Sequence, residues 1–198
     1  MADQISLVAK LLANENINVM KANISTAAFD IKNRTLVLPQ WNDMTDEIEQ
    51  MLVAHEIGHA LWTNELYYQA IDNKVLDFPH AQEYLNIFED IRVERLCKIR
   101  YPGIRKTFRE GYKQLADRDF FGTKGKSLEV MSFPDRVNLY YKLGTTVQIP
   151  FSTEEKRFVN RAEKTETIQD VISLVQDVYD FCKSSGVESI FDILKSFD

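Results

Sequence analysis

The most regular hydrophobic pattern in the chain lies between Thr45 and Asn64. Six side chains there occupy positions i, i+3, i+4, i+7, i+11 and i+14, which lie on one face of an α-helix; they are Ile48, Met51, Leu52, His55, His59 and Trp62. Thr45 stands where an N-cap is expected, and the acids Asp46 and Glu47 follow in the first turn. The pattern predicts a helix of about four to five turns that ends near Thr63 and Asn64.

Further helical patterns follow along the rest of the chain. After a polar stretch with Pro79, apolar periodicity predicts a second helix from about 80 to 99, which stops at Tyr101-Pro102-Gly103. More helices are predicted downstream. A proline at a first-turn position opens one over 134–143, the capping pair of Ser152 with Glu155 starts another after 152, and an apolar stripe predicts a third over 168–182; 104–118 is also predicted to be helical. Residues 120–127 are interpreted as a flexible basic loop, and residues 5–12 as an amphipathic helix.

A short β-hairpin is predicted before the first of these helices. Phe29 and Ile31 precede a Lys-Asn-Arg turn, and the β-branched and aliphatic run from Thr35 to Leu38 follows it, closed by Pro39. Because proline cannot donate to a ladder, we expect the second strand at a sheet edge. An edge strand can accept an extended peptide as one more strand.

These elements predict an α+β fold that is predominantly α-helical, with a small N-terminal sheet or hairpin. The chain has 198 residues, which suits a single domain over 1–198, and no linker rich in Gly, Ser or Pro divides it. Its formal net charge of -6 argues against nucleic acid as a partner. No stretch reaches the roughly 18 apolar residues of a membrane helix, and the start lacks the pattern of a signal peptide.

Cysteine usage indicates the compartment. Cys97 and Cys182 are the only cysteines and lie far apart in the sequence. Two isolated thiols do not form the disulfide framework of a small secreted domain, so a reducing compartment is the simpler interpretation. We therefore expect the protein in the cytoplasm.

The string His55-Glu56-Ile57-Gly58-His59 is an HExxH motif on the first predicted helix. Two histidines four residues apart stand one above the other on a helix, so their imidazoles can converge on one zinc ion. The glutamate after the first histidine then leans toward a water on that zinc. The alternative without a metal ion is a pair of core histidines hydrogen-bonded to carbonyl groups.

A catalytic zinc site needs a third protein ligand, and the second helix offers acids for it. Glu89 is the first choice because it lies 30 residues after His59, enough for a turn and an antiparallel return. Asp90 is the alternative: either Asp90 or Glu94 can ligate while the other takes the free N–H of a liganding histidine. His80, at the predicted start of the second helix, is a further candidate. For the acidic cluster, a solvated charged helix face is the competing interpretation.

Two strings carry a resemblance to a known family. VAHEIGHALW, preceded by RTLVLP, resembles the zincin metallopeptidases whose third ligand is a glutamate on a later helix, the gluzincins. NIFEDIRVER is similar to a pattern of phage and bacterial metallopeptidase domains that often accompany a von Willebrand A, cobaltochelatase-like domain. The resemblance implies a zinc site of His55, His59 and Glu89 with Glu56 as base, carried by residues 1–100, and a helical subdomain over 101–198. It also implies a von Willebrand A-like partner protein.

The expected function is therefore that of a zinc-dependent metallopeptidase. Zn²⁺ would be the cofactor, a peptide or protein the substrate, and Glu56 the general base that takes the proton of the attacking water. Tyr112, Tyr140 and Tyr141 are candidates for the hydrogen bond to the oxyanion. The alternative is a catalytically inactive binding or regulatory protein that zinc stabilises.

Overall fold

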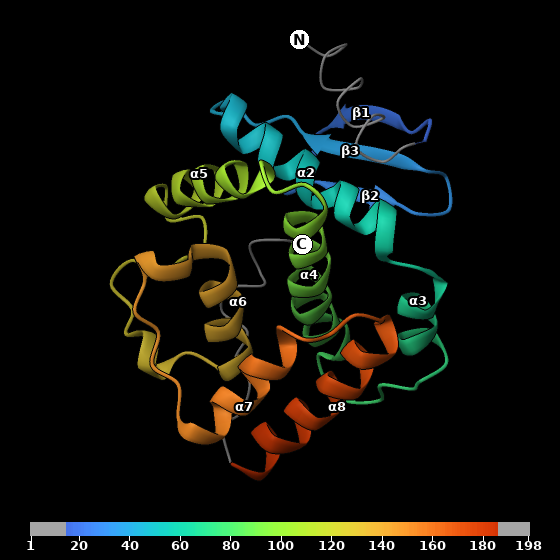
Figure 1. Cartoon of the computed structure of the whole chain (residues 1–198). Helices are drawn as coiled ribbons and strands as arrows, with labels where there is room; N and C mark the ends of the chain where they lie inside the picture. The colour runs from blue at the N-terminus through green and yellow to red at the C-terminus, as the bar shows by residue number, and fades with distance from the viewer. Residues whose placement is uncertain (1–14, 186–198) are drawn as a thin grey trace.

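The computed structural model describes residues 15–185, in which a small sheet comes first and helices follow (Figure 1). The elements, in chain order, are β1 (Asn18–Ala22), β2 (Ala28–Asp30), β3 (Thr35–Pro39), α2 (Asp46–Trp62), α3 (Glu65–Asp72), α4 (Ala81–Arg100), α5 (Ile104–Asp117), η1 (Leu128–Val130), α6 (Phe133–Leu143), η2 (Gly144–Thr146), α7 (Thr153–Ala162) and α8 (Ile168–Ser184). The predicted α+β fold, predominantly helical with a small N-terminal sheet, is confirmed. None of the helices within residues 15–185 is long and apolar enough to cross a membrane.

The sheet contains the predicted hairpin, but its edges differ from the prediction. β2 pairs antiparallel with β3, with Phe29 opposite Leu36, while β1 pairs with β3 in parallel. The strand order is β1-β3-β2, so the prediction of β3 as an edge strand is wrong: β3 is central, and β2 lies at an edge of the sheet that residues 15–185 form. The central position accepts Pro39 because it is the last residue of its strand, opposite Ala22.

The helices follow the sequence patterns closely. α2 begins after Thr45, whose side chain accepts a hydrogen bond from the Ile48 N–H, and α4 to α8 occupy the predicted ranges, with the capping box of Ser152 and Glu155 in place. α3 was not predicted. It has eight residues, and its apolar side chains Leu66, Tyr67 and Ile71 are only partly buried against the neighbouring helices, so the segment was interpreted as part of the polar stretch before Pro79. The helix predicted over 5–12 lies outside the described residues.

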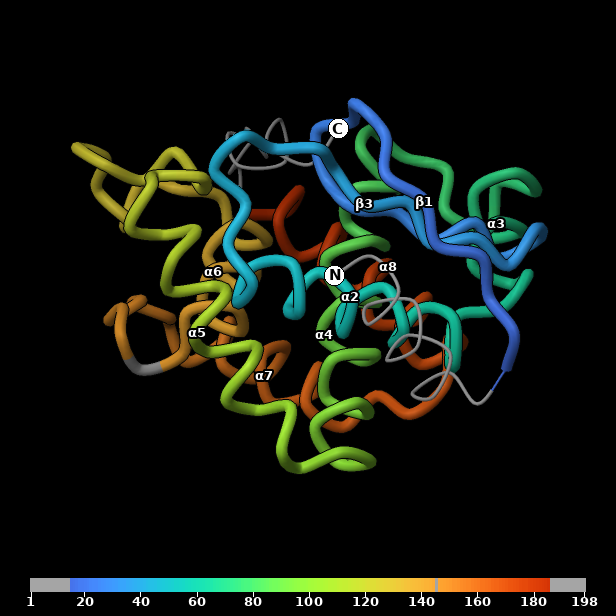
Figure 2. The backbone as a smooth tube through the Cα atoms, turned by 90° about the horizontal axis from the view of Figure 1, so that it is seen from above, coloured from blue at the N-terminus to red at the C-terminus, as the bar shows by residue number. Residues whose placement is uncertain are grey.

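The helices pack in two connected groups. α2 lies against the sheet and is crossed by α5, as the view from above shows (Figure 2). α4 contacts α2 at one side and α6 and α8 at the other (Figure 1). One hydrophobic cluster joins the sheet, α2 and α5, and the other joins α4 with α3, α6, α7 and α8. The boundary between the two clusters does not coincide with residue 100. Most buried apolar residues of α4, which precedes this position, lie in the second cluster, and those of α5, which follows it, lie in the first.

Gly111 lets α5 approach α2 closely. A Cβ atom at this position would lie 2.4 Å from the Cβ of Met51 and 3.1 Å from the backbone oxygen of Glu47. We expect Gly111→Ala to push the helices apart and lower the free energy of unfolding by about 1–3 kcal/mol, measured by urea denaturation. Gly103→Ala is the matched control, since nothing lies within 4 Å of its Cβ position. Equal stability of the two variants would contradict this packing.

Candidate metal centre

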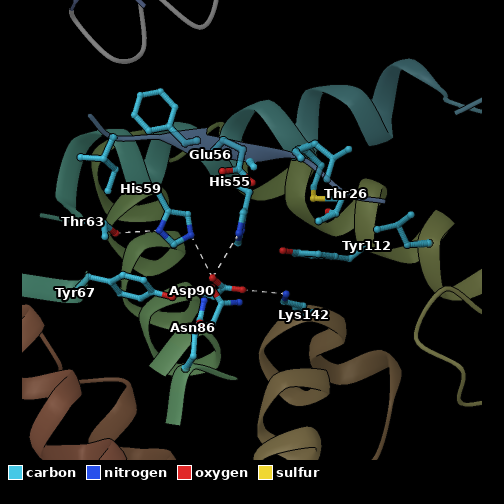
Figure 3. Close-up of a pocket in the computed structure, with 18 of the residues that line it drawn as sticks. Thr26, His55, Glu56, His59, Thr63, Tyr67, Asn86, Asp90, Tyr112 and Lys142 are labelled. Carbon is cyan, nitrogen blue, oxygen red and sulfur yellow. Dashed lines mark hydrogen bonds and ion pairs between the residues drawn. The ribbon is translucent and has the colours of Figure 1, made fainter. Parts of the chain in front are cut away.

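His55 and His59 lie one turn apart on α2 and face Asp90 of α4 (Figure 3). The Nε2 atom of His59 is 3.2 Å from Oδ1 of Asp90, and the Nε2 atom of His55 is 3.5 Å from the same oxygen. The three residues form a group whose ligand atoms all lie within 4.8 Å of one another and could hold a metal ion. The packing of α4 on α2 therefore gathers two nitrogens and one carboxylate oxygen about one point.

A hydrogen bond fixes each imidazole through its other nitrogen. Nδ1 of His55 is 3.0 Å from Oε1 of Glu94, and a carboxylate can only accept, so this nitrogen is the donor. Nδ1 of His59 is 2.9 Å from the Thr63 hydroxyl, which in turn donates to Oε1 of Glu89 over 2.5 Å and so accepts from the ring. In the neutral rings the lone pair then resides on Nε2, toward Asp90. This is the tautomer that a metal-ligating histidine needs.

The two separations between Asp90 Oδ1 and the imidazole nitrogens fit a tetrahedral zinc ion. Ligand nitrogen and oxygen atoms lie about 2.0–2.1 Å from zinc, so two of them in a tetrahedral shell are about 3.3 Å apart. The observed separations of 3.2 and 3.5 Å between Asp90 Oδ1 and the two Nε2 atoms match this value. Two neutral imidazoles and one carboxylate are also a ligand set typical of catalytic rather than structural zinc.

Glu89, the first choice for the third ligand, is not brought to the imidazoles. It is fully buried, and Arg92 donates to its two oxygens from Nε and Nη2 over 2.8 and 2.6 Å. Neighbouring positions on a helix point about 100° apart, so when Asp90 faces His55 and His59, Glu89 turns toward Thr63 and Arg92. The sequence alternative, with Asp90 at the imidazoles and Glu94 on a ring N–H, is the arrangement found.

Arg92 also links Glu89 to the backbone of two other segments. Besides binding Glu89, its guanidinium donates to the backbone oxygens of Trp62 and Glu166, both at 2.8–2.9 Å. It thereby ties the end of α2 to the segment that precedes α8. His80, the remaining sequence candidate, lies apart: its half-exposed ring pairs with Glu83.

The charges around the imidazoles favour a cation between them. Burial lowers the pKa of His55, but the charge of Asp90 and the hydrogen bond to Glu94 outweigh it and raise the value to about 9. For Asp90, burial is outweighed by His55 and Lys142, which hold its pKa well below the usual range. Burial likewise opposes ionisation of Glu94, yet Lys98 and His55 lower its pKa to about 2. Two ionised carboxylates thus face the ring atoms of His55 and stabilise positive charge there.

A cavity of about 320 Å³ opens beside this group. Its wall includes the edge strand β2, with Ala28 and Phe29, and the two histidines and Glu56. Glu56 is 6% exposed, and burial raises the pKa of its carboxyl group. A carboxylate made more basic by burial, next to a candidate metal site and in contact with an open cavity, suits a general base.

Several residues of the site were not found from the sequence. Lys142 of α6 pairs with Asp90 over 3.2 Å, and Thr63 and Tyr67 line the cavity (Figure 3). Of the three tyrosines considered, Tyr112 lines the cavity and donates its hydroxyl to Glu94, whereas Tyr141 donates to the Val159 backbone oxygen. Only the position of Thr63 four residues after His59 carries a local signal, because that spacing places both on one helix face.

Comparison of the chain with models of protein families, with curated proteins and with solved structures gives no match. The zincin resemblance of the two strings consequently stays a prediction, and the function is inferred from the site itself.

Proposed function

We propose that the protein is a zinc-dependent metallopeptidase in which His55, His59 and Asp90 hold the metal and Glu56 is the general base. The observation that carries this proposal is the carboxylate oxygen of Asp90 at zinc-ligand spacing from the Nε2 atoms of both histidines, with both Nδ1 atoms hydrogen-bonded. A purely structural zinc site needs no general base, so the presence of Glu56 favours a catalytic site.

The chain's own residues supply the proton chemistry. Zinc, when bound, acts as a Lewis acid that lowers the pKa of a water and polarises a carbonyl group. Glu56 takes the proton of the attacking water and returns it to the leaving amine, so one carboxylate acts first as base and then as acid. The burial that raises its pKa assists both transfers, because it keeps the two protonation states closer in energy.

The substrate peptide docks along β2. The sequence suggested the strand from Thr35 to Leu38, but that strand is central, whereas β2 is an edge strand whose residues Ala28 and Phe29 line the cavity. An extended peptide added beside β2 gains main-chain hydrogen bonds and lies over the histidines. Recognition of the backbone in this way selects for extended chains.

Hydrolysis of a mixed pool of quenched fluorescent peptides tests the proposal. Protein loaded with one equivalent of zinc is expected to cleave peptides from the pool, and 1,10-phenanthroline is expected to stop the cleavage until zinc is restored. Binding of zinc without cleavage of any peptide would contradict a peptidase and favour the alternative of a zinc-stabilised binding protein.

Removal of the Thr63 hydroxyl tests whether its hydrogen bond with His59 Nδ1 supports zinc binding. Thr63→Val keeps the shape but leaves His59 Nδ1 without its acceptor, so we expect a roughly 10- to 100-fold loss of zinc affinity, measured by competition with a chromogenic chelator. Thr165→Val is the matched control, because it removes another buried threonine hydroxyl, one that donates to Ala162. Equal zinc affinity in both variants would show that Thr63 does not orient His59.

We place this activity in the cytoplasm. Cys97 and Cys182 are both free and buried, and burial raises the pKa of the Cys97 thiol to about 12. Such thiols are stable in a reducing compartment and take no part in the chemistry. A von Willebrand A-like partner protein stays a prediction from the resemblance.

A further inference from the structure

The two oxygens of Asp90 have different partners. Oδ1 faces both imidazoles, whereas Oδ2 is 3.2 Å from the ammonium group of Lys142 (Figure 3). Lys142 comes from α6, 52 residues further along the chain, and its side chain is only 6% exposed. The ion pair therefore joins a distant helix to the one candidate ligand that has two equivalent donor atoms.

The position of Lys142 is fixed by packing as well as by charge. α6 packs against both α4 and α5, and the ammonium lies 5.6 Å from the ring centroid of Tyr112 on α5. A buried lysine is costly unless it is paired, and Asp90 provides the partner. Lys142 is thus held beside Oδ2.

The ion pair with Lys142 affects how many coordination positions Asp90 can fill around a metal ion. A carboxylate can bind a metal through one oxygen or through both, and the second mode occupies one more coordination position. A catalytic zinc site needs an open position for water and substrate. An ammonium group on Oδ2 attracts that oxygen and repels a cation approaching it, which favours coordination through Oδ1 alone.

We propose that Lys142 is a positioning residue that reserves Oδ2 of Asp90 and so keeps a coordination position free beside His55 and His59. The proposal rests on the metal site proposed above and adds the residue that determines how its acid binds. Lys142 acts through Asp90. It also lines the cavity, where its charge contributes to the surface that a substrate meets.

Cobalt(II) in place of zinc tests this role without measuring activity. Four-coordinate cobalt absorbs visible light much more strongly than five-coordinate cobalt. We expect the wild-type chain to bind one Co²⁺ with the intense four-coordinate spectrum, and Lys142→Met to bind Co²⁺ with an absorbance several-fold weaker, because both oxygens of Asp90 then coordinate. Lys142→Arg keeps a cation at Oδ2 and is expected to retain the intense spectrum.

Lys98→Met is the matched control. Lys98 forms the same kind of ion pair, at 2.9 Å, with Oε2 of Glu94, an acid of α4 whose other oxygen holds Nδ1 of His55. Its removal takes away one positive charge near the site but leaves Oδ2 of Asp90 paired, so the four-coordinate spectrum is expected to persist.

The outcomes separate the two proposals. Failure of the wild-type chain to bind Co²⁺ would overturn both the metal site and the role of Lys142. Binding by the wild type with an unchanged spectrum in Lys142→Met would overturn only the role of Lys142, as would an equal loss of absorbance in Lys98→Met. A Lys142→Met variant that loses thermal stability but keeps the intense spectrum would assign Lys142 to helix packing alone.

Discussion

Replacing Glu56 by Gln is expected to leave zinc binding intact and to lower peptide hydrolysis by roughly 100- to 10,000-fold. The amide keeps the size and hydrogen-bonding capacity of the side chain but cannot take a proton from water. Because Glu56 belongs to the cavity wall and not to the group of His55, His59 and Asp90, the metal site keeps all three of its ligands. Turnover of a peptide cleaved by the wild type, with metal content measured on the same sample, gives the result.

Glu49→Gln controls for the loss of a buried acid from α2. Glu49 is 7% exposed, lies two turns before Glu56 and pairs with Lys21, away from the cavity. We expect this variant to hydrolyse peptides at the wild-type rate. Full activity of Glu56→Gln would exclude Glu56 as the base, and an equal loss in both variants would point to a disturbance of the helix.

Asp90→Asn and Glu89→Gln are expected to differ in zinc binding, although the residues are adjacent and each pairs with a buried cation. Asp90→Asn removes the charged donor between the imidazoles, so zinc affinity should fall by more than the roughly 10- to 100-fold that follows loss of an outer partner. Glu89→Gln leaves the guanidinium of Arg92 buried without its carboxylate, which should lower the free energy of unfolding by about 3–5 kcal/mol while zinc still binds.

Calorimetric titration of the two variants with zinc distinguishes the roles, and denaturant unfolding measures how much stability each loses with its ion pair, Asp90 with Lys142 and Glu89 with Arg92. The reverse pattern, with zinc binding lost in Glu89→Gln and kept in Asp90→Asn, would restore Glu89 as the ligand and contradict the geometry of the site. Both substitutions replace an acid by its amide at neighbouring positions of one helix, so the size of each side chain is kept.

Local patterns predicted most of the fold. The helix from Asp46 to Trp62 has a cap, an acidic first turn and a long apolar face, all of which lie within its own sequence. β1 and α3 carry weaker signals: β1 is mostly exposed, and α3, although Asn64 caps it and Glu65 lies in its first turn, has only eight residues and buries a single alanine. Their structure depends on pairing with β3 and on packing against α4 and α8, which a local pattern does not contain.

Local patterns likewise predict only part of the site. The spacing of His55 and His59 places them together on any helix, so the motif was found from sequence alone. The choice between Glu89 and Asp90 depends on how α4 is rotated against α2, which long-range packing decides. Lys142 occupies a buried polar stripe of α6 with Asp135 and Asn138, and such a stripe looks from sequence like a solvated helix face.

His55, His59 and Asp90 together are expected to hold one zinc ion. Zinc titration of chelator-stripped protein, followed by elemental analysis after gel filtration, measures it directly for the wild type and for His55→Ala/His59→Ala. This metal site predicts one zinc per wild-type chain and none retained by the double variant. A wild-type chain that retains no zinc, or a double variant that retains as much as the wild type, would contradict it.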